Sequence, residues 1–247
     1  MFVMSIGSFL ERYGTGGRKL ESHGALRRQG LVCEWDRTSE VLFISHEWTS
    51  VAHPDPDGQQ TAELCTFLER LRSGIVDVDL SREHELIKQC KSGPGKVTAV
   101  RGREWRRRLT AAHIWMDYIS APQPRAPHCG EPSRPQQCEM SSQMEELNAA
   151  IASIPAYIAQ CSIFVAFAPT CVTRQTSSRT VATSYVTWRR RGWTRFEFLL
   201  AKLSAVPKIS LVVRSGSVAP VFDPPPSTGS NCVPVRANSR VAGLTTG

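Results

Sequence analysis

Five polar and aromatic side chains have the types that ligand binding or acid–base chemistry requires. Ser45, His46 and Trp48 directly follow a short apolar run, Asp117 ends a second apolar run, and Glu197 lies one helical turn after a tryptophan. An aromatic face can stack on a ring or base, carboxylates accept hydrogen bonds from hydroxyl groups, and an imidazole with nearby backbone N–H groups can donate to phosphates. We therefore expect Trp48 to stack on a ring, Asp117 and Glu197 to bind hydroxyls, and His46 to contact phosphate.

Each of these side chains also has a structural interpretation. His46 at a strand end is either an acid–base or ligand-contacting group or a hydrogen-bonded structural residue. Ser45 lacks the glycine-flanked turn of a nucleophile, which favours a cap. Asp117 either holds a ribose or caps its own loop, and Trp48 either stacks on a ligand or packs under the turn at 53–58.

The helix expected from Trp193 to Ser204 sets the position of Glu197. At 100° per residue the apolar side chains gather on one arc, which we expect to be buried. These side chains are Phe196, Leu199, Leu200 and Leu203. Trp193 faces the same arc, so it is either a core residue or a ring-stacking residue, and Glu197 borders it. Glu197 is then either a solvated flank residue or a partly desolvated acid with a raised pKa.

The elements that position these residues alternate between strand and helix. Short continuous apolar runs predict strands near 41–45, 113–118, 162–168 and 208–213 in one parallel sheet, with 162–168 in its interior. Helices are expected at 60–72, at 140–161 with a kink or break near Ser153 caused by Pro155, and from Trp193. The pattern predicts a doubly wound α/β fold with a parallel sheet of four to five strands. Ligands bind beyond the carboxyl ends of such strands, which places the candidate residues on one rim.

Local composition divides the chain into parts. Residues 1–40 show no sustained period and are expected to form a loosely ordered arm. Residues 41–214 form the α/β domain, with an insertion at 74–112 and a long loop at 119–139. Residues 215–247 are rich in Pro, Ser, Gly and Thr and are expected to be disordered.

Composition and charge limit the cellular environments and the ligands that are expected for this chain. The 247 residues are 41% hydrophobic and have a net charge of +8, with no run long enough to span a membrane and no secretory leader. Eight cysteines without CxxC pairs favour a cytoplasmic protein. Cys129 and Cys138 beside His128 form the sole pair with loop spacing, and no second pair accompanies them, so no metal site is predicted.

The positive charge is clustered. Basic residues crowd the segment 96–108, and a second group comprises Arg189, Arg190, Arg191 and Arg195. Such clusters are either solvated surface or sites that attract phosphate groups, and no nucleic-acid-binding motif accompanies them. We expect weak, non-specific polyanion binding.

Three segments together resemble a known family. Val41-Leu42-Phe43-Ile44-Ser45-His46 resembles the first strand of TIR (Toll/interleukin-receptor) domains, and residues 161–169 resemble their third strand. Arg191-Gly192-Trp193-Thr194-Arg195-Phe196-Glu197 resembles the helix that carries a Trp and, four residues on, a Glu. A fourth segment, Ile114-Trp115-Met116-Asp117-Tyr118, is more similar in sequence to the heterokaryon-incompatibility relatives of this family and to TIR-like proteins of unicellular algae and fungi.

The resemblance covers residues 41–214 and implies a flavodoxin-like sheet with NAD as a substrate rather than a cofactor. Glu197 matches the essential glutamate of members that cleave NAD at the nicotinamide–ribose bond, so the chain is expected to be an NAD+ nucleosidase. Two alternatives stay open: a non-catalytic module that self-associates into homo-oligomers, and a basic phosphate- or nucleic-acid-binding protein on the same sheet.

Overall fold

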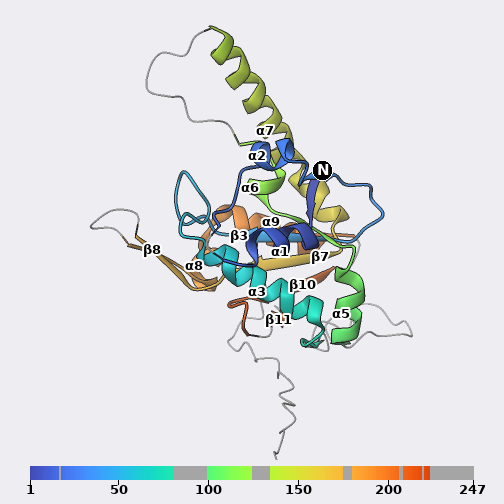
Figure 1. Cartoon of the computed structure of the whole chain (residues 1–247). Coiled ribbons are helices and arrows are strands. Elements are labelled where there is room, and N and C mark those ends of the chain that lie inside the picture. Colours follow the sequence, from blue (N-terminus) through green and yellow to red (C-terminus); the bar gives the residue numbers. More distant parts are fainter. Residues whose placement is uncertain are drawn as a thin grey trace, which may run out of the picture.

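The computed structural model of the chain has helices on both faces of a central sheet (Figure 1). It describes residues 1–16, 18–79, 99–123, 134–174, 180–205, 208–218 and 220–222. Within these residues no helix combines the length and apolarity needed to cross a membrane.

The central sheet has seven strands among the described residues, in the order β11-β10-β7-β3-β6-β1-β2. Its inner four are parallel: β10 (Ile209–Val213), β7 (Ile163–Phe167), β3 (Val41–His46) and β6 (His113–Trp115). In the register, Phe43 of β3 lies opposite Phe164 of β7. The four predicted strands are parallel with β7 in their interior, as expected, but the sheet is larger than the four to five parallel strands predicted, because three further strands pair antiparallel at its two sides. The fold is α/β with a mostly parallel sheet and flanking helices.

The strands are apolar on both faces because helices cover both. Along β3, Leu42 and Ile44 belong to one core, while Val41 and Phe43 belong to the other. The first core is closed mainly by α1 (Ile6–Tyr13), α3 (Gln59–Ser73) and α5 (Gly102–Leu109). The second is closed by α7 (Arg134–Gln160), α8 (Tyr185–Arg190) and α9 (Gly192–Leu203). Two-sided burial is what continuous apolar strands require.

The described residues of the segment 1–40 form strands and helices, so the expectation of a loosely ordered arm is wrong. β1 (Phe2–Ser5) pairs antiparallel with β6, and β2 (Cys33–Glu34) pairs with β1. Ser5 caps α1, whose buried residues recur at helical spacing: Ile6, Phe9, Leu10 and Tyr13. The short helix α2 (His23–Arg28) adds Leu26 to the same core. β2 is an edge strand of the sheet and β1 lies next to it. Both strands are short, so their pairing depends on tertiary contacts that periodicity does not reveal.

Several predicted boundaries also shift. The strand predicted at 113–118 ends at Trp115, and Asp117 begins α6 (Asp117–Ser120). α7 starts at Arg134 and continues through Pro155 to Gln160, so the helix does not break near Ser153. The long loop predicted at 119–139 is thus bounded by helical residues at each end, and 124–133 lie outside the described residues.

The predicted insertion and tail each contain regular structure. Within 74–112, β4 (Val78–Asp79) pairs antiparallel with β5 (Ala99–Val100), and α5 packs against α3. In the predicted tail, β11 (Val221–Phe222) pairs with β10. A further hairpin joins β8 (Cys171–Arg174) to β9 (Thr180–Thr183). Residues 80–98 and 223–247 lie outside the described residues.

Candidate functional site

The candidate residues converge where the parallel strands end. Ser45 and His46 are the last two residues of β3, and Asp117 follows β6 by two positions. α9 lies against β3 and β7 and brings Glu197 to this edge. We call the cluster Ser45, His46, Trp48, Asp117 and Glu197 the rim cluster.

Glu197 is held by the end of β3. The Ser45 hydroxyl donates to its Oε2 at 2.5 Å, and the carboxyl-bearing residue is 3% exposed. The Trp188 indole of α8 donates to the Ser45 carbonyl at 3.2 Å, which also anchors this strand end. Burial raises the pKa of Glu197 to about 8, with Asp117 adding to the rise, while hydrogen bonds from Ser45 and Trp193 and the charge of His46 oppose it.

The orientation of α9 is opposite to the expected one. Its buried residues are Thr194, Glu197 and Ala201, whereas four large apolar side chains predicted to be buried or to face the core are exposed. These are Trp193, Phe196, Leu199 and Leu203. Small and hydrogen-bonding side chains on the inner face let the helix approach the sheet: the Thr194 hydroxyl donates to the backbone carbonyls of Trp188 and Arg191. A buried polar side chain with partners is tolerated, so hydrophobic periodicity alone selected the wrong face.

Asp117 holds His46 and Trp48. Its Oδ1 contacts His46 Nε2 at 2.9 Å and accepts from the Tyr118 backbone N–H, and its Oδ2 accepts from the Trp48 indole at 2.8 Å. Burial disfavours the charge on both partners, but their mutual attraction outweighs it: the pKa of His46 is raised and the pKa of Asp117 is lowered. The contact therefore favours the protonated imidazole and the ionised carboxylate, and Asp117 Oδ1 also accepts from a backbone N–H in the first turn of α6.

Trp48 is part of a small aromatic group beside this ion pair. Its ring meets Tyr118 edge-on with the centroids 5.7 Å apart, and His53 packs on Tyr118 from the adjoining turn. Both predicted interpretations of Trp48 thus remain as predictions: the ring contacts its neighbours, and the side chain is only half-buried.

A second buried acid, Glu47, lies at the same edge and was not among the predicted site residues. Glu47 is buried and accepts from Arg191 Nε at 2.8 Å and from the Thr187 hydroxyl at 2.6 Å. Gln60 donates to the Glu47 carbonyl at 2.8 Å. The signal was available, because Glu47 directly follows the candidate pair Ser45-His46 and a run of three arginines ends at Arg191. This ion pair fastens the start of α9 to the end of β3.

The structure therefore brings three of the predicted residues to Glu197 or Asp117. Ser45 contacts Glu197, and His46 and Trp48 contact Asp117. The two groups are electrostatically linked, because the charges on His46 and Asp117 both affect the pKa of Glu197. Trp193 lies one turn before Glu197 and is 44% exposed, so a core role for it is excluded.

No protein-family model matches the sequence, and the searches of curated proteins and of solved structures find no match either.

Metal chemistry finds no support in the part of the chain that the structure describes. No group of three His, Cys, Asp or Glu side chains there is arranged to hold an ion. His128 and Cys129, which belong to the pair with loop spacing, lie outside the described residues.

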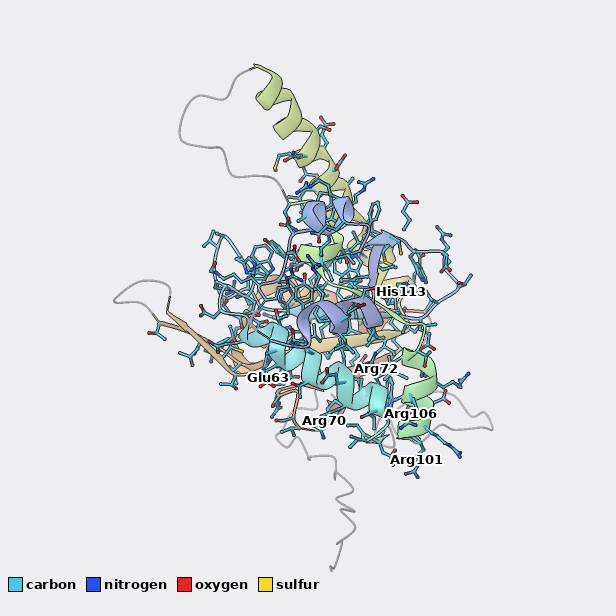
Figure 2. All side chains as sticks on the ribbon, viewed as in Figure 1. Glu63, Arg70, Arg72, Arg101, Arg106 and His113 are labelled. Atoms are coloured by element: carbon cyan, nitrogen blue, oxygen red, sulfur yellow. The ribbon has the colours of Figure 1, made fainter. Side chains whose placement is uncertain are left out.

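The basic segment lies far along the sheet from the rim cluster. α5 leads into the first residue of β6, His113, and so sits at the amino ends of the parallel strands, where Figure 2 shows Arg101 and Arg106 near Arg72. Three of its arginines already face acids: Arg101 with Asp77, Arg107 with Glu104 and Arg108 with Glu40. Paired guanidinium groups are less available to phosphate, so polyanion binding stays a prediction of weak affinity.

Proposed function

We propose that the chain is a TIR-like domain with a flavodoxin-like sheet that binds an NAD-type nucleotide at the rim cluster and cleaves its nicotinamide–ribose bond. The observation that carries this proposal is Glu197, a desolvated carboxyl group held by Ser45 at the ends of parallel strands. This edge is where α/β sheets bind nucleotides.

The environment of Glu197 suits a positively charged substrate. In the free protein its pKa of about 8 keeps the group mostly neutral at pH 7. A bound nicotinamide ring carries a positive charge, which favours the ionised carboxyl group and lowers that pKa. Binding of NAD is therefore expected to release a proton near neutral pH, and the resulting carboxylate faces the ring in a medium with little screening.

That carboxylate serves the bond-breaking step. The bond between C1′ and the ring nitrogen breaks with its electron pair passing to the ring, which neutralises nicotinamide and leaves an oxocarbenium-like ribose. Glu197 stabilises this positive charge as it moves to the sugar. A water molecule then adds to C1′ and loses a proton, giving ADP-ribose.

The other candidates act around this step. Ser45 orients the Glu197 carboxyl group, and Trp48 and Trp193 supply aromatic faces for the ring and the base. His46 is the cationic donor toward phosphate or ribose oxygens. Asp117, whose oxygens are already hydrogen-bonded to His46 and Trp48, keeps both in place and reaches the ligand through its remaining exposed surface.

The test is nicotinamide release from NAD by the purified chain. Glu197→Gln keeps the shape of the side chain and removes its ionisation, so release should fall by at least about 100-fold. Glu11→Gln on the exposed face of α1 is the matched control and should be unaffected. Absence of turnover by the wild-type protein at high enzyme concentration would contradict the proposal.

A second candidate function is a non-catalytic interaction module. It is favoured by the outer face of α9, where large apolar side chains are exposed next to the rim cluster. Concentration-dependent assembly without nicotinamide release would support this alternative.

A further inference from the structure

Two buried polar atoms beside the rim cluster have no hydrogen-bond partner of good geometry among the described residues. They are Nδ1 of His46, at the end of β3, and Oε1 of Gln60, in the first turn of α3. Buried polar atoms in proteins are almost always hydrogen-bonded, so two such atoms at one site need an explanation. Their chemistry is complementary, because an imidazole nitrogen can carry a proton and an amide oxygen can accept a hydrogen bond from it.

The Gln60 side chain is fixed beside the His46 ring. Gln60 is 2% exposed, and its Nε2 donates to the backbone carbonyl of Glu47 at 2.8 Å. Glu47 directly follows His46, so this bond holds the amide at the end of β3. Because the NH2 group is committed to the carbonyl, Oε1 is the atom left for the ring, and a hydrogen bond with Gln60 is among the interactions that raise the pKa of His46.

The opposite side of the ring determines which nitrogen is protonated. His46 Nε2 lies 2.9 Å from Oδ1 of Asp117, whose pKa is lowered. An ionised carboxylate only accepts hydrogen bonds, so Nε2 carries a proton. In the neutral ring no proton is left for Nδ1, and its lone pair then faces the lone pairs of Gln60 Oε1. Only the cation, which has a proton on both nitrogens, satisfies Asp117 and Gln60 together.

From this geometry we infer that Gln60 is a positioning residue for His46: its Oε1 accepts the second N–H of the ring and holds the ring as a cation between α3 and α6. Loss of that proton leaves both atoms buried and unpaired, which is costly. The inference rests on the proposed function only in its consequence that a bound nucleotide meets this positive charge. The contact itself does not depend on NAD.

Other groups also act on the charge of this ring. Desolvation by burial opposes the cation, whereas the charges of Asp117 on α6 and Glu197 on α9 favour it. Glu47 is the next residue along the chain, but its carboxyl group already accepts from Arg191. Gln60 differs from these acids because it contributes a hydrogen bond and not a charge. Substitutions that keep the length of its side chain can therefore separate the two contributions.

The test is the titration of His46 in the full chain, followed by NMR of the imidazole Cε1–H group. The chain has six histidines, and the signal of His46 is the one that is missing from the spectrum of His46→Gln. In the wild-type protein this signal should titrate above the ordinary value of histidine, because Asp117 and Gln60 both favour the cation.

Two substitutions of Gln60 should move the midpoint of this titration in opposite directions. Gln60→Met removes the acceptor and should lower the midpoint by about one pH unit, whereas Gln60→Glu replaces the neutral acceptor by a carboxylate and should raise it. Gln59→Met is the matched control, because the neighbouring amide binds the backbone of Val172 in β8, and it should leave the midpoint unchanged. Thermal unfolding at pH 6 checks that each variant is folded.

Nicotinamide release supplies a second measurement, which a purely structural Gln60 would not affect in this way. Between pH 6 and pH 8 the His46 ring should lose its proton in Gln60→Met and keep it in the wild-type protein. The KM of the variant for NAD should therefore rise relative to wild type by at least about threefold over this range, while kcat changes less. If the wild-type protein releases no nicotinamide, the proposed function fails, and the NMR titration still decides the role of Gln60.

Three results of the titration would overturn the inference. A wild-type His46 that titrates at or below the ordinary value of histidine shows that the ring is not held as a cation. A midpoint that neither Gln60→Met nor Gln60→Glu changes shows that Gln60 does not bind the ring. A midpoint that falls in both variants shows that lost packing, and not the lost acceptor, moves the proton.

Discussion

Two carboxyl groups of the rim cluster are held in opposite ionisation states. Glu197 is 3% exposed, receives hydrogen bonds from two neutral groups, the Ser45 hydroxyl and the Trp193 indole, and has its pKa raised to about 8. The Asp117 side chain is 29% exposed, contacts the His46 ring and has its pKa lowered. The difference comes from the partner as much as from burial: a cation compensates the desolvation of Asp117, and nothing of that kind contacts Glu197.

This contrast assigns the roles in the proposed reaction. Sites that separate the pKa values of neighbouring acids usually divide the chemistry between them. Glu197 is the group whose charge changes when a cationic ring arrives, while Asp117 stays ionised and keeps His46 charged and oriented. The following substitutions either remove or enlarge the difference between the lowered pKa of Asp117 and the raised pKa of Glu197.

Loss of the ion pair should have the largest effect on stability. Asp117→Asn leaves the His46 ring buried without a counter-charge, so the free energy of unfolding should fall by about 2–4 kcal/mol at pH 6. The pair needs Asp117 ionised and His46 protonated. Its stabilisation is therefore lost as the pH falls below the ordinary range of aspartate and lost again as the pH rises through the raised pKa of His46.

Urea unfolding from pH 4 to pH 9 measures this dependence. The deficit of the variant should be greatest between these limits. A deficit that does not vary with pH would show that Asp117 acts through its hydrogen bonds with Trp48 and the Tyr118 backbone N–H and not through an ion pair.

Removal of the Glu197 carboxyl group, whose pKa is raised, should have the next largest effect on stability. Unlike the loss of the ion pair, this change should stabilise the protein. The folded protein retains the Glu197 proton up to a pKa of about 8, whereas the unfolded chain loses it near the ordinary glutamate value. Wild-type stability should therefore decline as the pH rises through this window. Glu197→Gln abolishes that decline and should be more stable than wild type at pH 9 by on the order of 2 kcal/mol.

Thermal unfolding at pH 6 and pH 9 tests this prediction. At pH 6 the advantage of the amide should be smaller than at pH 9, because the wild-type protein has lost only part of its stability at that point of the window. Equal melting temperatures at both pH values would mean that the Glu197 side chain is solvated and ionised in the folded protein, which would also weaken the proposed function.

The hydrogen bond from Trp48 to Asp117 should contribute less to stability than the contact between Asp117 and His46. Trp48→Phe keeps the aromatic contact with Tyr118 and removes the donor to Asp117 Oδ2, so we expect a loss of about 1 kcal/mol in chemical denaturation. Trp193→Phe is the comparison, because that ring is exposed and its replacement should cost less. A larger loss for Trp193→Phe than for Trp48→Phe would show that Trp193, and not Trp48, contributes more to stability.

The Ser45 hydroxyl should contribute least to stability. Its hydrogen bond lowers the pKa of Glu197, so Ser45→Ala should move the pH-dependent decline in stability upward by about half a pH unit, equivalent to about 0.7 kcal/mol. The measurement is the midpoint of stability against pH, and a downward shift would show that the hydroxyl accepts from a protonated Glu197 rather than donating to it.

The resemblance and the strand rule together predicted most of the rim cluster. Ser45 and His46 end an apolar run, and the rule for parallel sheets assigns such residues to one edge. Glu47 was within reach of the same reasoning but was passed over. The pairing of Asp117 with both His46 and Trp48 was out of reach, because the three residues are up to 71 positions apart and nothing in the local pattern specifies their contacts.

The sequence by itself determined the four parallel strands, since uninterrupted apolar runs tolerate only two-sided burial, and it determined the edge where polar side chains gather. Only the tertiary structure decided which face of α9 turns inward. That choice depends on how closely the helix approaches β3 and on whether Thr194 and Glu197 find hydrogen-bond partners, which the count of apolar residues around the helix does not record. The same packing places Glu197 out of water and sets its pKa, because desolvation is a property of the assembled neighbours and not of the glutamate or its position in the chain.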